Sequence, residues 1–142
     1  MHPTITKLLL AIGVLSTCGQ VLAETEAPRD ATLRRAVIGK WCLSEDGSKS
    51  CWGYNVLRAD GTFSSSGVHP ETQRPFHIEG TFEAKGRQTC FLAIRNDSEL
   101  NPKAGESMCS TILSVEQGRQ VFRQYGDDTV RTIYRVKDGA AP

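Results

Sequence analysis

Cysteine, histidine, serine and carboxylate side chains carry the chemistry that this sequence offers, and the cysteines give the clearest signal. Four of the five cysteines follow residue 23, separated by 8, 38 and 18 residues: Cys42, Cys51, Cys90 and Cys109. An even number of cysteines behind a candidate export signal predicts two disulfide bonds. Each bond is expected to contribute about 2–4 kcal/mol to stability.

A turn signal indicates how these cysteines pair. Asp46-Gly47 lies midway between Cys42 and Cys51, and Asp-Gly is a strong signal for a two-residue hairpin turn. This register places Cys42 opposite Cys51 at a non-hydrogen-bonded site, where opposing side chains are closest and a disulfide fits most easily. It also predicts an aromatic cross-strand pair of Trp41 with Trp52 on the other face.

The remaining cysteines, Cys90 and Cys109, then form the second bond. They lie directly opposite each other if their hairpin is centred between residues 99 and 100, inside a long polar loop. A metal site is the alternative interpretation of the four cysteines. Their spacing contains no C-x-x-C pattern, which disfavours it.

Histidine and serine side chains offer a weaker signal for catalysis or metal binding. Nucleophilic catalysis needs a base beside the nucleophile and a group that orients the base. The run 64–66 is three serines near His69, yet a serine run on a strand is commonly solvated surface. His77 and Glu79, with His69 and Glu71, could form a metal site, but the spacing matches no known ligand pattern. We therefore expect no catalytic residue, no metal and no cofactor.

Residues 1–23 have the features of a signal peptide. Lys7 supplies positive charge, residues 8–15 form an apolar run, and residues 21–23 end in the small residue that cleavage requires. The run is too short to span a bilayer. Lipidation at Cys18 is the alternative, because the preceding residues loosely resemble a lipoprotein box. We expect a periplasmic or secreted protein without a transmembrane segment in the mature chain.

The mature chain, residues 24–142, has the size of one domain and a balanced charge. Removing Lys7 leaves 16 basic and 16 acidic residues, interspersed along the sequence. Such a chain carries no strongly basic face for nucleic acid or an anionic membrane. We expect a monomer that has no nucleic-acid partner.

Residues 24–38 are predicted to be a polar leader followed by a short helical turn that begins near residue 32 and ends at Gly39. From residue 39 the pattern has a period of two, as in half-buried strands; for example, Phe76, Ile78 and Phe82 share one face of their strand. Turn residues separate eight predicted strands, near 39–45, 48–58, 62–68, 75–84, 88–96, 107–116, 119–125 and 129–137.

Eight short strands joined by hairpins predict an all-β fold, an antiparallel up-and-down barrel over residues 39–142. Closure removes the exposed sheet edges that a small open sheet would leave. A two-sheet sandwich is the alternative.

The segment Ile38-Gly39-Lys40-Trp41, followed by this meander, resembles the start of the calycin superfamily, which includes lipocalins, fatty-acid-binding proteins and avidins. In that pattern the tryptophan plugs one end of the barrel under a basic residue of the last strand. The resemblance implies a lipocalin-like barrel with a structural plug made by Gly39, Trp41 and an arginine near the C-terminus. Because the last strand runs antiparallel to the first, Arg135 is expected to be the partner rather than Arg131.

Two departures limit what the resemblance implies about ligands. Avidins carry polar biotin-binding residues directly after the Gly-x-Trp motif, where this chain has Cys42, Leu43 and Ser44. Fatty-acid-binding proteins use an inward arginine and tyrosine two residues apart, whereas Arg131 and Tyr134 must face opposite sides of a regular strand. Neither biotin binding nor that carboxylate clamp is implied.

The resemblance implies a non-catalytic binding protein of the cell envelope that binds a small apolar ligand or a protein partner. Candidate ligand-lining residues are aromatic: Trp52, Tyr54, Phe63, Phe76 and Phe82. In so short a chain we expect these rings to fill the interior, with a ligand cavity as the alternative. A second hypothesis is a periplasmic inhibitor of a secreted hydrolase, using the leader 24–31 or the loop 96–106.

Overall fold

The computed structural model describes residues 26–44, 47–48, 50–124 and 126–137, with side chains from residue 31 onward. The signal peptide predicted over residues 1–23, with Cys18, lies outside this part of the chain. The described elements are a helix and eight strands: α1 (Glu26–Val37), β1 (Gly39–Leu43), β2 (Gly53–Leu57), β3 (Thr62–Val68), β4 (Pro75–Lys85), β5 (Gln88–Asn96), β6 (Ser107–Glu116), β7 (Arg119–Gln124) and β8 (Val130–Arg135).

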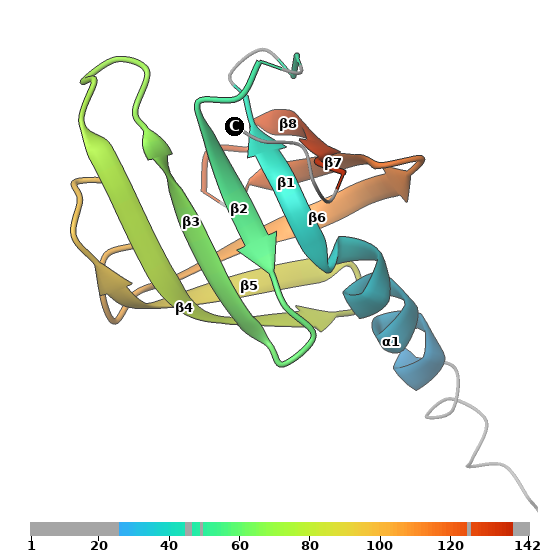
Figure 1. Ribbon diagram of the computed structural model, residues 1–142. Helices are drawn as coiled ribbons and strands as arrows, with labels where there is room; N and C mark the ends of the chain where they lie inside the picture. Colours follow the sequence, from blue (N-terminus) through green and yellow to red (C-terminus); the bar gives the residue numbers. More distant parts are fainter. Residues whose placement is uncertain (1–25, 45–46, 49, 125, 138–142) are drawn as a thin grey trace, which may run out of the picture.

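The strands form a closed barrel in chain order, and each strand pairs antiparallel with its neighbours (Figure 1). The all-β, eight-stranded up-and-down fold is therefore confirmed, and the two-sheet sandwich is wrong. Strand β8 closes the barrel by pairing Arg135 with Trp41 and Tyr134 with Cys42.

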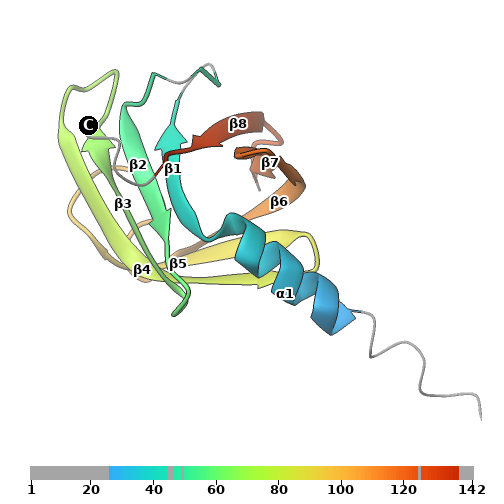
Figure 2. The same ribbon diagram turned by 45° about the vertical axis from the view of Figure 1, so that its right-hand side comes forward.

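Helix α1 is longer than the predicted helical turn. It begins at Glu26, within the segment that we expected to be a loose leader. Pro28 falls in the first turn, where a missing backbone N–H costs nothing, and the following residues have no strong helix breaker. The helix lies against the closed end of the barrel beside β4 and β5 (Figure 2), where Val37 is fully buried.

Alternation along the strands divides the barrel wall into an inner and an outer face, as predicted. On β4, Phe76, Ile78 and Phe82 are buried, whereas Glu79 and Glu83 are exposed. Nine buried side chains from α1 and six strands form one apolar core: Val37, Trp41, Leu57, Phe63, Phe76, Ile78, Phe82, Ala93 and Ile133.

Both predicted disulfide bonds are present, Cys42–Cys51 and Cys90–Cys109. Cys90 lies directly opposite Cys109 on β5 and β6, in the register centred between residues 99 and 100. Cys42 instead joins β1 to Cys51 in the segment before β2.

The predicted register of the first hairpin is wrong. Trp41 lies opposite Asn55 rather than Trp52, because β2 begins at Gly53 and its register with β1 is shifted by three residues. Gly53 pairs with Gly67 of β3, and a Cβ at Gly53 would lie 2.7 Å from a backbone oxygen and 3.0 Å from the Phe76 ring. A side chain at Gly53 would not fit this contact, so the packing fixes the place of Gly53 against β3 and β4. The β1–β2 register differs from the one that the Asp46-Gly47 turn signal predicts, and Asp46 lies outside the described residues.

Trp41 seals the closed end of the barrel. Its side chain is fully buried, and the Arg135 guanidinium carbon lies 4.7 Å from the centre of the indole ring. Gly39 has a φ of +137°, and a Cβ there would collide with Arg135 Nη1. Glycine is therefore required at this position both by the backbone and by the arginine.

The same two side chains cap the C-terminus of α1. Trp41 Nε1 donates to the carbonyl of Val37 at 2.7 Å. Arg135 donates to the carbonyls of Ala36 and Ile38, each at 2.6 Å. The last carbonyls of a helix lack partners within the helix, so these three bonds fasten α1 to β1 and β8.

The loop between β5 and β6 folds back over the open end of the barrel. Asn96 Oδ1 accepts from the N–H and hydroxyl of Ser98 at 2.8 and 2.7 Å. Asn96 Nδ2 donates to the carbonyls of Leu100 and Pro102 at 2.7 and 2.8 Å. One side chain therefore organises most of the loop.

We expect Trp41→Ala to lower the free energy of unfolding by about 3–5 kcal/mol, because it empties the core and removes a helix cap. Chemical denaturation followed by circular dichroism measures the loss. Trp52→Ala at the open end is the matched control and should cost less, since Trp52 is only partly buried. Equal losses in the two variants would contradict the role of Trp41 as the plug.

We expect Asn96→Ala to free residues 98–102 and to cost about 1–3 kcal/mol, because four hydrogen bonds meet at this side chain. Hydrogen exchange measured by mass spectrometry should show faster exchange in that segment alone. Glu99→Ala, which removes only an exposed ion pair with Lys103, should leave exchange unchanged. Unchanged protection in Asn96→Ala would refute this account of the loop.

Candidate binding site

A cavity of about 390 Å³ occupies the barrel interior toward the end opposite the Trp41 plug. The segments at its mouth follow β1, β3 and β5, and they contribute Ser44, Pro70 and Leu100. Its volume lies at the lower end of the range of small-molecule sites, about 300–1,000 Å³. The expectation that side chains fill the whole interior is therefore wrong.

Aromatic and aliphatic side chains make most of the cavity wall. Phe63 packs edge-to-face on Phe91 with ring centres 5.1 Å apart, and Trp52 lies 5.5 Å from Phe76. Further apolar lining residues come from the loops and the other strands: Leu43, Ile78, Leu100, Pro102, Met108, Ile112, Phe122 and Ile133.

The five predicted lining residues separate into two groups. Trp52, Phe63 and Phe76 line the cavity. Tyr54 does not, because the actual register of β2 turns it to the outer face, where the Lys40 ammonium lies 4.1 Å from its ring centre. Phe82 is buried at the closed end, with Arg34 5.7 Å from its ring centre, and it does not line the cavity.

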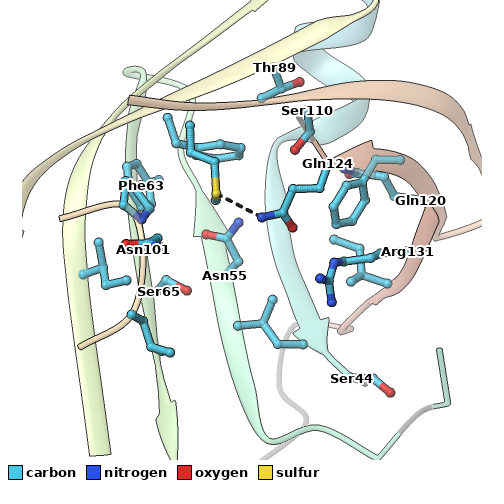
Figure 3. Close-up of a pocket in the computed structure, with 18 of the residues that line it drawn as sticks. Ser44, Asn55, Phe63, Ser65, Thr89, Asn101, Ser110, Gln120, Gln124 and Arg131 are labelled. Carbon is cyan, nitrogen blue, oxygen red and sulfur yellow. Dashed lines mark hydrogen bonds between the residues drawn. The ribbon is translucent and has the colours of Figure 1, made fainter. Parts of the chain in front are cut away.

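The cavity exists because several inward positions carry short polar side chains instead of large apolar ones. Asn55 and Ser65 are paired on β2 and β3. Thr89 and Ser110 are paired on β5 and β6. Figure 3 shows these side chains around the cavity, with Asn55 directed into it. The sequence signal for them was their place in the alternation, two residues from buried Leu57, Phe63 and Ile112 and from partly buried Phe91.

Some polar atoms of this wall are poorly paired. Asn55 Oδ1, Thr89 Oγ1 and Trp52 Nε1 are buried and have no hydrogen-bond partner among the described residues. Gln124 donates to Met108 Sδ at 3.3 Å (Figure 3), and a thioether sulfur is a weak acceptor. Buried polar atoms without partners are uncommon, so these atoms mark a site where a further group can bind.

Arg131 is the one arginine, lysine or carboxylate side chain among the described residues that line the cavity. It belongs to β8, and its Nη2 lies 3.3 Å from Asp127 Oδ2. The pKa of Asp127 lies below its ordinary value, chiefly because the Thr129 N–H donates to the carboxylate and also because of Arg131. Asp127 is therefore ionised at neutral pH and compensates the arginine charge.

The candidate metal and nucleophile residues lie on different surfaces. His69 lines the cavity mouth, where its ring centre lies 6.1 Å from that of Trp52. His77 pairs with Glu79 on the outer face at 2.8 Å and lowers the pKa of that carboxyl by hydrogen bonding. In the run 64–66, Ser65 lines the cavity, while Ser64 accepts a hydrogen bond from Arg58.

The described residues contain neither a metal-binding cluster nor a membrane-spanning helix. No group of three or more histidine, cysteine, aspartate or glutamate side chains in this part of the chain could hold a metal ion. Within the same residues, no helix is both long and apolar enough to cross a bilayer.

Comparison with known proteins relates the chain to others by fold alone. No family model matches the sequence, and no curated protein matches it. A lipocalin-like protein from Bacteroides uniformis ATCC 8492 superposes with a TM-score of 0.54 at 14% identity, over 71% of this chain and 99% of that one. An uncharacterized protein from Bacteroides eggerthii DSM 20697 superposes with a TM-score of 0.51 at 11% identity, over 70% and 98%. The chain has the fold of a lipocalin-like barrel.

Proposed function

We propose that this chain is an exported, non-catalytic binding protein that holds a small, largely apolar molecule inside the barrel. The observation that carries the proposal is the cavity of about 390 Å³, walled by aromatic rings and open at the end opposite the plug. A preformed concave site with few polar groups is the usual form of a small-molecule site. The lipocalin-like fold supports a binding role.

Export is part of the same proposal. Two disulfide bonds are expected in an oxidising compartment, and the pattern of residues 1–23 agrees with a signal peptide. Disulfide bonds and a signal peptide are compatible with either a periplasmic or an extracellular location, and lipidation at Cys18 stays the alternative. A monomeric form stays a prediction.

The contacts of the described residues favour a ligand cavity over the inhibitor hypothesis. That hypothesis needs a projecting arm or loop. Residues 26–31 are instead part of α1, and the loop 97–106 is tied back over the cavity by Asn96. Inhibition of a secreted hydrolase stays a prediction without a specific contact to support it.

Ser65 and Ser66 provide a matched pair of variants that tests the location of binding. They are neighbours on β3, but Ser65 lines the cavity whereas Ser66 is exposed on the outer face. The probe is 1-naphthol, two fused rings with one hydroxyl, titrated by calorimetry. We expect Ser65→Phe to weaken binding about tenfold or more, because the new ring fills the site, and Ser66→Phe to bind like the parent protein.

Two results would contradict the proposal. Equal weakening, or none, in both variants would place the probe outside the barrel. No binding of the probe by the parent protein would show that the cavity does not accept a small ring compound.

A further inference from the structure

We propose that the ligand of this cavity is a neutral molecule that donates a hydrogen bond to Asn55, such as an alcohol, a phenol or an amide on an apolar skeleton. The inference rests on the proposed function and narrows it. It excludes two other classes of apolar ligand, the pure hydrocarbon and the carboxylate.

The buried acceptor oxygens define the first requirement. Asn55 Oδ1 on β2 and Thr89 Oγ1 on β5 are buried, and neither has a partner among the described residues. Both residues line the cavity, and Thr89 is only 1% exposed. The side chains that pair with them across the strands, Ser65 and Ser110, add further hydroxyl groups to the wall.

Displacing water from these atoms costs free energy, and this cost makes the cavity prefer ligands that can donate a hydrogen bond. Water that enters a polar cavity hydrogen-bonds to such oxygens. A ligand that displaces the water without offering a donor leaves Asn55 Oδ1 unpaired, because an amide oxygen can only accept, and this costs affinity; the Thr89 hydroxyl can instead donate. A ligand with a hydroxyl or an N–H replaces the lost bond. The wall therefore discriminates between two ligands of equal shape that differ in one donor.

Charge defines the second requirement. Arg131 is the one permanently charged side chain among the described lining residues, and Asp127 already lies 3.3 Å from it. A carboxylate ligand would have to compete with Asp127 for the guanidinium and would be repelled by it. His69 is the other titratable group on the wall, and its Nδ1 already accepts from the Thr72 N–H. A neutral ligand is not repelled by the Asp127 carboxylate and does not compete with it for Arg131.

Cavity size limits the apolar skeleton. At about 30 Å³ for each water-sized group, 390 Å³ holds roughly a dozen non-hydrogen atoms. A two-ring or short-chain skeleton fits, whereas a long acyl chain would extend out through the mouth. Because rings of Phe63, Phe91 and Phe76 form the wall, a flat ring compound packs well against it.

Three probes with one skeleton test the proposal. They are 1-naphthol, 1-methoxynaphthalene, which lacks the donor, and 1-naphthoate, which carries a negative charge. Affinities are measured by calorimetry at about pH 8, where histidine side chains are generally neutral. We expect the parent protein to bind 1-naphthol about tenfold or more tightly than either of the other probes.

The variant Asn55→Leu tests whether Asn55 causes the preference for 1-naphthol, because leucine has nearly the shape of asparagine but lacks the acceptor oxygen. In this variant 1-naphthol should bind no more tightly than 1-methoxynaphthalene, whose own affinity is unchanged or higher. The melting temperature should not fall, since the amide oxygen has no hydrogen-bond partner among the described residues. A lower melting temperature would show that Asn55 serves the fold, and would overturn the assignment.

The outcomes separate this inference from the proposed function. Equal binding of 1-naphthol and its methyl ether by the parent protein, both weakened by Ser65→Phe, would refute the donor requirement and leave the cavity as a binding site. Tighter binding of 1-naphthoate would refute the neutral ligand and assign the site to Arg131. Binding of no probe would overturn the proposed function together with the inference.

Discussion

The stacking of Arg135 on Trp41 is the interaction on which the rest of the structure depends. It joins the first and last strands where only two residue pairs close the barrel, and it caps the helix through the carbonyls of Ala36, Val37 and Ile38. Gly39 is fixed by the same contact, because any side chain there would occupy the place of the guanidinium. One buried indole and one arginine thus hold helix, first strand and last strand together.

Sealing one end decides where a ligand could enter. The rings nearest the plug, such as Phe82, are fully packed, whereas the inward positions toward the other end include Asn55, Ser65 and Ser110. These short side chains leave room for a ligand, and their polar atoms favour ligands that can form hydrogen bonds. The loop organised by Asn96 reaches the cavity through Leu100 and Pro102, so it forms one part of the cavity mouth.

The sequence allowed the fold to be predicted because its strongest signals are local and repeated. Period-two alternation and turn residues each depend on neighbours along the chain, and Cys90 was paired with Cys109 because Cys42 was already paired with Cys51. The register of β1 with β2 could not be predicted in this way, because the turn signal is local, whereas Gly53 pairs with Leu43 of β1 and also packs on Gly67 and Phe76 of two further strands. That shift turned Tyr54 outward and Asn55 inward. The aromatic lining was therefore partly predicted, whereas its polar atoms, which depend on register, were missed.

Methyl NMR of isoleucine-labelled protein tests the central claim, that the ligand binds inside the barrel, most directly. Ile78, Ile112 and Ile133 line the cavity, whereas Ile94 is 66% exposed on the outer face. On titration with 1-naphthol, ring-current shifts should appear at the three cavity methyl groups and not at Ile94. Shifts confined to Ile94, or no shifts at saturating probe, would contradict the account.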